Sequence, residues 1–153
     1  MVIYVIRHGE TDWNTKHWLQ GTTDIPLNRN GIEVAEITSE ALKGIPFDVI
    51  FSSPLKRAYQ TAEIMKRERQ IPLIVDERLK EISFGCFEGL CCTGPNYNIP
   101  DPDFPNFFQN PAHYNPPEGG ESIAELCVRG TDFLTWLIDR PEYQDKTVLI
   151  SAH

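Results

Sequence analysis

Four short apolar runs punctuate the chain, and each has the pattern of a buried β-strand. They lie within residues 2–6, 48–51, 72–75 and 147–150 and are rich in valine, isoleucine and leucine. A short, continuously apolar run is typical of a strand in a parallel sheet, where helices cover both faces. We therefore expect four strands, and we expect the first of them to be buried on both faces.

Two segments between these runs have helical spacing and recognisable ends. The first begins after Asn28, a plausible N-cap, and closes at Lys43-Gly44 with a cation and a C-terminal glycine. The second begins with Ser53 as N-cap and Pro54 at the first helical position, and runs to about Arg69. The expected inner face of the first helix consists of Ile32, Ala35, Ser39 and Leu42.

The clearest amphipathic helix begins at Ser122, where Glu125 completes a capping box three residues on. Strands therefore alternate with helices along the chain, which predicts an α/β fold with a mainly parallel sheet. The expected inner face of this last helix consists of Ile123, Leu126, Cys127, Gly130, Phe133, Leu134, Leu137 and Ile138.

The least regular part of the chain, residues 91–120, is rich in proline. Seven of the chain's 12 prolines lie between Pro95 and Pro117, mixed with aromatic residues. So much proline prevents a long helix or a central strand, and the aromatics argue against a disordered linker. We expect this segment to form a lid over the functional site and to set specificity.

Composition and charge restrict the class of protein. A chain of 153 residues with 41% hydrophobic content is expected to form one globular domain, residues 1–153. No apolar run has membrane-spanning length and no signal-peptide pattern precedes the first strand, so a cytoplasmic location is expected. The four cysteines have no zinc-binding spacing and are interpreted as reduced thiols.

The net charge of −8 argues against a nucleic-acid or anionic-membrane partner. An anionic substrate would also be disfavoured at long range. Any phosphate site must therefore be a local pocket built from a few arginines and histidines.

Such residues follow the predicted strands. Arg7 and His8 come directly after the first strand, Arg57 lies in the first turns of the helix after the second, and His153 follows the fourth. Because the carboxyl ends of parallel strands share one edge, these side chains are expected to meet there. Guanidinium matches phosphate geometry and imidazole can attack phosphorus, so the set predicts a phosphate pocket and not a metal site. Gly9 is interpreted as leaving room for the incoming group.

Five motifs in order resemble those of the histidine phosphatase superfamily, in its phosphoglycerate-mutase-like branch. The resemblance covers the chain outside the Pro-rich segment. The motifs are Arg7-His8-Gly9-Glu10-Thr11 with Trp13-Asn14; Ser52-Ser53-Pro54-Leu55-Lys56-Arg57-Ala58 with Gln60-Thr61-Ala62; Leu79-Lys80-Glu81 with Phe84-Gly85 and Glu88-Gly89; Gly119-Gly120-Glu121-Ser122; and His153.

The resemblance implies a three-layer sandwich with a mainly parallel central sheet and a role for each matched residue. His8 matches the nucleophile that takes the phosphoryl group, and Glu81 matches the general acid that protonates the leaving oxygen and later deprotonates water. No metal or cofactor is implied. The implied phosphate and substrate pocket consists of Arg7, Arg57 and His153, with Asn14, Gln20 and Gly21 as neighbours.

Some of these roles have structural alternatives. Glu10 and Glu88 compete with Glu81 as the acid, and either could instead hold loop backbone. Asn14 and Gln20 could simply tie down their own loop.

The chain departs from the family pattern in two places. The family commonly has a glycine and a basic residue shortly before Gln20-Gly21, whereas this chain has His17 and Trp18, so one cationic contact is expected to be missing. The family's usual C-terminal segment, which begins with a glycine after His153, is also missing. The chain is then either a fragment or truncated. If it is truncated, a terminal carboxylate on His153 would repel phosphate and raise the pKa of that histidine, and loss of the C-terminal segment would leave the sheet under-covered.

The expected function is metal-independent hydrolysis of a small phosphorylated metabolite through a phosphohistidine. One alternative is a phosphoglycerate mutase, which needs a tight, basic lid, yet residues 91–120 contain no lysine or arginine. The other is a truncated, inactive phosphate-binding protein. The sequence leaves the exact ester and the oligomeric state open, with a homodimer as one alternative.

Overall fold

The computed structural model describes all 153 residues, and its centre is a four-stranded sheet in which every neighbouring pair is parallel. The strands are β1 (Val2–Arg7), β2 (Val49–Ser52), β3 (Leu73–Val75) and β4 (Thr147–Ala152). Their order in the sheet is β1-β4-β2-β3, so the last strand in the chain lies between the first two. All four predicted strands and the parallel sheet are confirmed.

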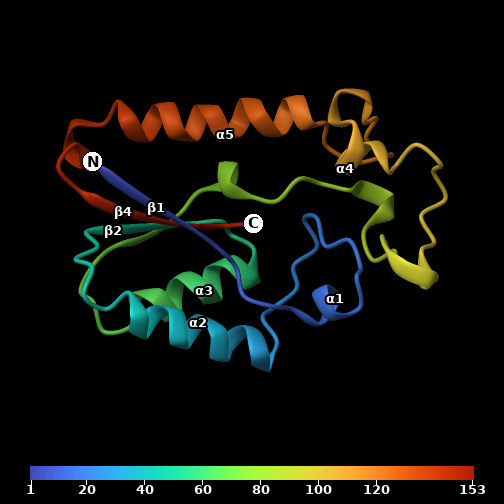
Figure 1. Cartoon of the computed structure of the whole chain (residues 1–153). Coiled ribbons are helices and arrows are strands. Elements are labelled where there is room, and N and C mark those ends of the chain that lie inside the picture. Colours follow the sequence, from blue (N-terminus) through green and yellow to red (C-terminus); the bar gives the residue numbers. More distant parts are fainter.

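Helices cover both faces of this sheet (Figure 1). Helices α2 (Arg29–Ala41) and α3 (Lys56–Lys66) lie on one face, and α5 (Ile123–Ile138) lies on the other. Two short helices, α1 (Asp12–Thr15) and α4 (Asn106–Gln109), lie beyond the sheet. None of the helices combines the length and the apolar character needed to cross a bilayer.

Two apolar cores join these layers, which confirms the expected three-layer α/β architecture. Burial of such clusters is the main favourable contribution to folding. The core between the sheet and α2 and α3 contains Ala35, Phe47, Ile50, Ala62, Met65 and Leu149. The core between the sheet and α5 contains Val49, Phe51, Phe133, Leu137, Val148 and Ile150.

Two of the three predicted helix starts are confirmed. The Asn28 side chain accepts a hydrogen bond from the Gly31 amide at 2.8 Å, and Ser122 and Glu125 form the predicted capping box. These caps satisfy amides that the first turn of a helix leaves unpaired.

The third predicted start is wrong. Helix α3 begins at Lys56, after Leu55 as N-cap, and Ser53 does not cap it. The Ser53 hydroxyl instead lies 2.9 Å from a ring nitrogen of His153, 100 residues later in the chain. A long-range contact therefore uses the side chain that local sequence assigned to a cap.

The first strand is not buried on both faces as expected. Strand β1 is at the edge of the sheet and pairs only with β4, and its Val5 is 68% exposed. Cys127, Leu134 and Ile138 of α5 and Ile32 of α2 were expected to face inward but are also exposed. Helix α5 therefore leaves part of its own face of the sheet uncovered.

The Pro-rich segment, residues 91–120, packs at the side of the sheet around a separate core that it shares with residues from the preceding loops. An antiparallel bridge joins Trp18 to Cys91 at its beginning, and another joins Phe84 to Gly120 at its end. These contacts attach the segment to the loops that follow β1 and β3. Its core contains Leu19, Ile82, Phe84, Phe87, Ile99, Phe104 and Tyr114.

Candidate functional site

The carboxyl edge of the sheet brings the two candidate histidines together. The parallel register pairs Arg7 with Ala152, so His8 and His153 follow neighbouring strands side by side. The His8 amide donates to the Ala152 carbonyl at 3.0 Å, and the two imidazole centroids lie 5.1 Å apart. The predicted convergence of these residues is therefore present in the structure.

His8 has one ring nitrogen bound and the other directed at a cation. Its Nδ1 lies 2.7 Å from its neighbour's carbonyl, that of Gly9, and an N–H donor there leaves the lone pair on Nε2. Arg57 Nε donates to this Nε2 at 3.2 Å. Burial, helped by Arg57 and Arg7, lowers the pKa of His8 to about 4, although the Gly9 carbonyl opposes the shift. At neutral pH His8 is therefore an uncharged imidazole with an oriented lone pair.

Arg57 is the buried cation of the site. It is the second residue of α3, and its side chain is among the largest that the fold buries completely. Its Nη1 donates to the Thr23 carbonyl at 3.0 Å and its Nη2 to the Gly21 carbonyl at 2.7 Å. Burial lowers the pKa of this guanidinium, while Glu81 and more distant carboxylates raise it. Backbone carbonyls therefore hold the charge in place without a direct carboxylate partner.

Gly21 belongs to the site through its backbone. Its φ is +52°, and a Cβ there would lie 2.1 Å from the Glu88 carboxylate, so a larger residue would not fit. That carboxylate accepts from the amides of Thr22 at 2.9 Å, Thr23 at 2.8 Å and Phe84 at 3.1 Å. Glu88 thus holds loop backbone, which was the alternative to its role as the acid.

Glu10, the other competitor, is held at the beginning of α2. Its Oε1 accepts from the side-chain amides of Asn28 at 2.9 Å and Asn30 at 3.1 Å, and these bonds lower its pKa. Gly9 beside it has a role that the sequence did not indicate. A Cβ on Gly9 would lie 2.5 Å from the Gly31 carbonyl, so its small size allows the close approach of α2.

A hollow of about 270 Å³ lies directly in front of His8. Arg7 is exposed and takes part in none of the ion pairs of the structure, so its charge is available to an anion there. The hollow is lined by Arg7, His8, Gly9, Glu10 and Asn14.

Asn14 and Gln20 both contact Thr11. Asn14 Oδ1 accepts from the Thr11 amide at 3.0 Å as part of the α1 capping box, and Gln20 Oε1 lies 2.9 Å from the Thr11 hydroxyl. Both side chains therefore tie down their loop, as the structural alternative predicted. Asn14 also lines the hollow, which leaves its Nδ2 group able to donate to a ligand.

His153 presents one bound and one unbound nitrogen. Its Nε2 lies 2.9 Å from the Ser53 hydroxyl, whereas its buried Nδ1 has no hydrogen-bond partner. Its pKa is lowered to about 2, first by burial and then by the charges of Arg57, His8 and other nearby groups.

Glu81 lies in a second hollow, of about 380 Å³, and does not line the one in front of His8. Its Oε1 accepts from the Ile82 amide at 2.9 Å. Its charge raises the pKa of the Arg57 guanidinium. The lining of the second hollow is entirely polar: Thr22, Glu77, Lys80, Glu81, Ser83, Gly119, Gly120, Glu121, Glu125 and Arg129.

Sequence reasoning missed two hydroxyls that support the site. Ser53 was assigned to a cap, and Thr61 was quoted only as part of a motif. The Thr61 hydroxyl donates to the Arg57 carbonyl at 2.8 Å and accepts from the Gly9 amide at 3.2 Å, which links α3 to the segment after β1. The spacing of four from Arg57 to Thr61, one helical turn, was a signal that could have found it.

Acid should destabilise the fold through these histidines. Because their folded-state pKa values lie below the unfolded value of 6.5, the unfolded chain binds more protons. Stability is then complete above about pH 6.5 and is lost as the pH falls toward 4. His8→Asn should reduce the slope of unfolding free energy against pH by on the order of 1 kcal/mol per pH unit. Urea unfolding from pH 7 to 4.5 measures both slopes, and equal slopes would contradict the pKa of His8.

Comparison with known proteins agrees with this geometry. The chain matches the histidine phosphatase superfamily (branch 1) over residues 3–153. It is 36% identical over 151 residues to the uncharacterized phosphatase PhoE of Bacillus subtilis, covering 99% of this chain and 70% of that protein. It is 32% identical over 157 residues to a 2,3-bisphosphoglycerate-dependent phosphoglycerate mutase of Cytophaga hutchinsonii, covering 99% and 71%. The solved structure of Bacillus stearothermophilus YhfR superimposes with a TM-score of 0.89 at 36% identity, covering 99% and 73%. This chain is therefore a member of the histidine phosphatase superfamily.

Proposed function

We propose that this protein hydrolyses phosphate monoesters of small metabolites through a phosphohistidine on His8. The observation that carries the proposal is the uncharged His8 imidazole, whose Nε2 lone pair is oriented beside the buried Arg57 guanidinium. An unprotonated nitrogen in a cationic setting is what nucleophilic attack on a phosphate dianion requires.

In the first step, Nε2 of His8 forms a bond to phosphorus while the ester P–O bond breaks. Arg7 and Asn14, which line the hollow, and Arg57 and His153, which lie beside His8, stabilise the charge on the equatorial oxygens. Glu81 gives its proton to the leaving oxygen. In the second step, the Glu81 carboxylate takes a proton from water, the water oxygen attacks phosphorus, and the P–N bond breaks to release phosphate.

The site residues supply charge stabilisation and proton transfer from side chains alone. Two guanidinium groups take the place of a Lewis acid at the phosphoryl oxygens, and a carboxyl group handles the proton. We therefore propose that catalysis is independent of metal ions and cofactors.

Hydrolysis is favoured over the mutase alternative by the charges around Glu81. With Glu81 protonated for the first step, its hollow contains three carboxylates, those of Glu77, Glu121 and Glu125, against two cations, Lys80 and Arg129, which leaves an excess of one negative charge. Both cations are already in ion pairs, with Glu77 and Glu121. A leaving group that is neutral or carries an ammonium fits this lining better than a carboxylate such as that of a phosphoglycerate.

We further propose that residues 91–120 form a specificity lid on a single catalytic domain. The segment packs around the core that it shares with the preceding loops, and its last residues, Gly119 and Gly120, line the hollow beside Glu81. The four free thiols fit a reducing compartment, and we propose a cytoplasmic location.

The nucleophile is tested by trapping the intermediate. His8→Ala should abolish hydrolysis, because no other group offers an oriented nitrogen at the phosphate hollow. A ³²P-labelled ester should leave an acid-labile, base-stable label on His8 of the native protein. His113→Ala, which changes an exposed histidine, serves as the matched control. Activity should survive EDTA. Strong metal dependence, or unlabelled His8 in an active protein, would overturn the proposal.

The role of Glu81 as the proton donor is tested by comparing esters whose leaving groups differ in basicity. An alkoxide must be protonated as it leaves, whereas the phenolate of an activated aryl ester can leave unaided. In single-turnover formation of phosphohistidine, Glu81→Gln should slow an alkyl phosphate by roughly 100-fold or more and 4-nitrophenyl phosphate much less. Glu10→Gln, which changes the half-buried competitor, should show no such selectivity. Equal slowing of both esters by Glu81→Gln would remove Glu81 from the role.

The preference for leaving groups is tested with matched esters. Phosphoethanolamine and glycerol 2-phosphate should be hydrolysed with a higher kcat/KM than 3-phosphoglycerate. The expected difference is roughly fivefold for each negative charge on the leaving group, since one charge pair at about 4 Å in water contributes about 1 kcal/mol. Glu77→Gln removes one carboxylate and should narrow this difference. Phosphate transfer from 2,3-bisphosphoglycerate to a phosphoglycerate faster than its release to water would instead support the mutase.

A further inference from the structure

Arg129 of α5 has a hydrogen-bond partner for all five of its N–H groups. Two of them form a bidentate ion pair with Glu121, at 2.6 Å from Nε and 2.7 Å from Nη2. Such fork-to-fork pairing fixes the plane of a guanidinium as well as its position. The side chain is only 20% exposed, so solvent competes little for these bonds.

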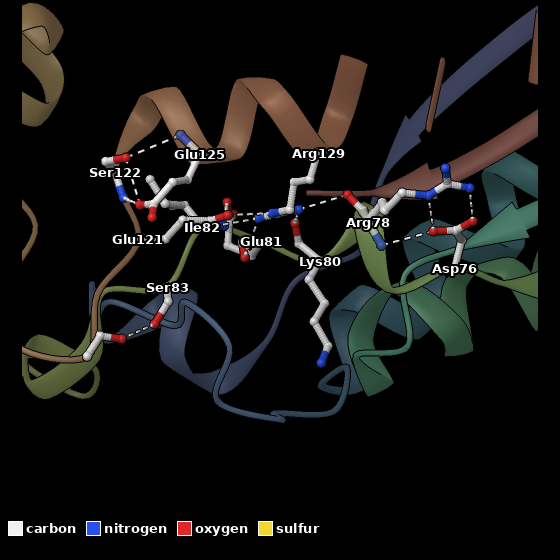
Figure 2. A network of polar contacts seen from close by, with 11 residues as sticks. Asp76, Arg78, Lys80, Glu81, Ile82, Ser83, Glu121, Ser122, Glu125 and Arg129 are labelled. Carbon is white, nitrogen blue, oxygen red and sulfur yellow. Dashed lines mark hydrogen bonds and ion pairs between the residues drawn. The ribbon is translucent and has the colours of Figure 1, made fainter. Parts of the chain in front are cut away.

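The other three N–H groups bind the backbone that carries Glu81 (Figure 2). Nη1 donates to the carbonyl oxygens of Arg78 at 2.8 Å and Lys80 at 2.5 Å, and Nη2 donates to that of Glu81 at 3.0 Å. Residues 80–83 belong to no helix or strand. Arg129 therefore replaces the regular hydrogen bonding that this segment lacks.

Glu121 ties the same segment on the far side of Glu81. Its amide donates to the Ser83 carbonyl at 2.8 Å while its carboxylate holds Arg129. Between these two attachments, the Ile82 amide donates to the Glu81 carboxylate, and the Ile82 side chain is almost completely buried. The backbone is thus fixed before and after Glu81, whose side chain lines the hollow.

Helix α5 gives this arrangement a firm base. Phe133 and Leu137 anchor the helix in the core on the sheet that also carries His8 and His153. A second ion pair, from Arg78 to Asp132 of α5 at 2.7 Å, lies three residues from Arg129 on the helix. The sheet therefore positions the nucleophile directly and positions Glu81 through α5.

We infer that Arg129, held by Glu121, is a positioning residue that fixes Glu81 in line with the leaving oxygen. The inference rests on the proposed function and goes beyond it, because Arg129 touches neither the phosphate nor the proton.

The leaving group distinguishes positioning from general structural support. Arg129→Lys keeps the charge but loses the fork that reaches Glu121 and three carbonyls. A displacement of about 1 Å at a catalytic group can cost roughly 100-fold. We expect Arg129→Lys to slow phosphohistidine formation from an alkyl phosphate by at least ~10-fold and from 4-nitrophenyl phosphate by less than about 3-fold.

A double-mutant cycle gives a second, independent readout. In a protein that already carries Glu81→Gln and so lacks the proton donor, adding Arg129→Lys should slow phosphohistidine formation from the alkyl ester by less than about 3-fold more. The reason is that substitutions whose effects pass through the same group are not additive. Effects that multiply, or equal slowing of both esters by Arg129→Lys, would overturn the inference.

Two further variants guard against a trivial loss of folding. Arg78→Lys weakens a comparable ion pair to α5 without touching the carbonyl contacts of Arg129, so it should lower stability but not change the ratio of alkyl to aryl rates. Glu121→Gln keeps an oxygen acceptor for Arg129 and should show the same selective loss in smaller degree. A non-selective Glu121→Gln would count against the inference even if Arg129→Lys failed to fold.

Failure of the proposed function would give a different result. A native protein that forms no phosphohistidine from any ester would overturn the hydrolase and, with it, this inference. If the native protein forms phosphohistidine and Glu81→Gln slows alkyl esters selectively but Arg129→Lys does not, the proposed hydrolase activity stands and only the role of Arg129 is overturned.

Discussion

The buried guanidinium of Arg57 is the charge on which the rest of the site depends. A cation taken out of water is costly unless its donors are satisfied, and here backbone carbonyls and the His8 ring supply the partners. One of those carbonyls belongs to Gly21, whose left-handed backbone passes against Glu88. The loop after β1, the beginning of α3 and the segment after β3 therefore take their positions from one side chain.

The same burial sets the protonation state of the histidines. Desolvation and the neighbouring arginines lower both pKa values well below neutrality, so the site carries fixed positive charge on arginine and none on imidazole. This combination of charged arginines and uncharged imidazoles suits phosphoryl transfer. The nucleophilic nitrogen must be unprotonated, and the negative charge that develops on oxygen is stabilised by cations that stay charged at neutral pH. A net charge of −8 on the chain leaves this local cluster responsible for anion binding.

The site is assembled from two sides of the sheet. The strands β1 and β4 place His8 and His153 through backbone register, which is rigid and local to the sheet. Residues 80–83, which carry Glu81, have no regular secondary structure and are held in place by Arg129 of α5. Helix α5 packs on the face of the sheet opposite to α2 and α3. Nucleophile and acid thus share a common base, although one is fixed by a strand and the other by a helix side chain.

The sequence by itself determined the alternation of strands and helices, the parallel sheet and the edge where His8 and His153 meet, because periodicity and caps such as Asn28 are local signals. Only the tertiary structure decided which strand lies at the edge of the sheet, and this position explains why Val5 of β1 is exposed. It also decided which small and charged residues serve as supports, because their partners are far away in the chain and no local pattern encodes them. Those contacts are Gly9 with Gly31, Gly21 with Glu88, Ser53 with His153, and Arg129 with the carbonyls of Arg78, Lys80 and Glu81.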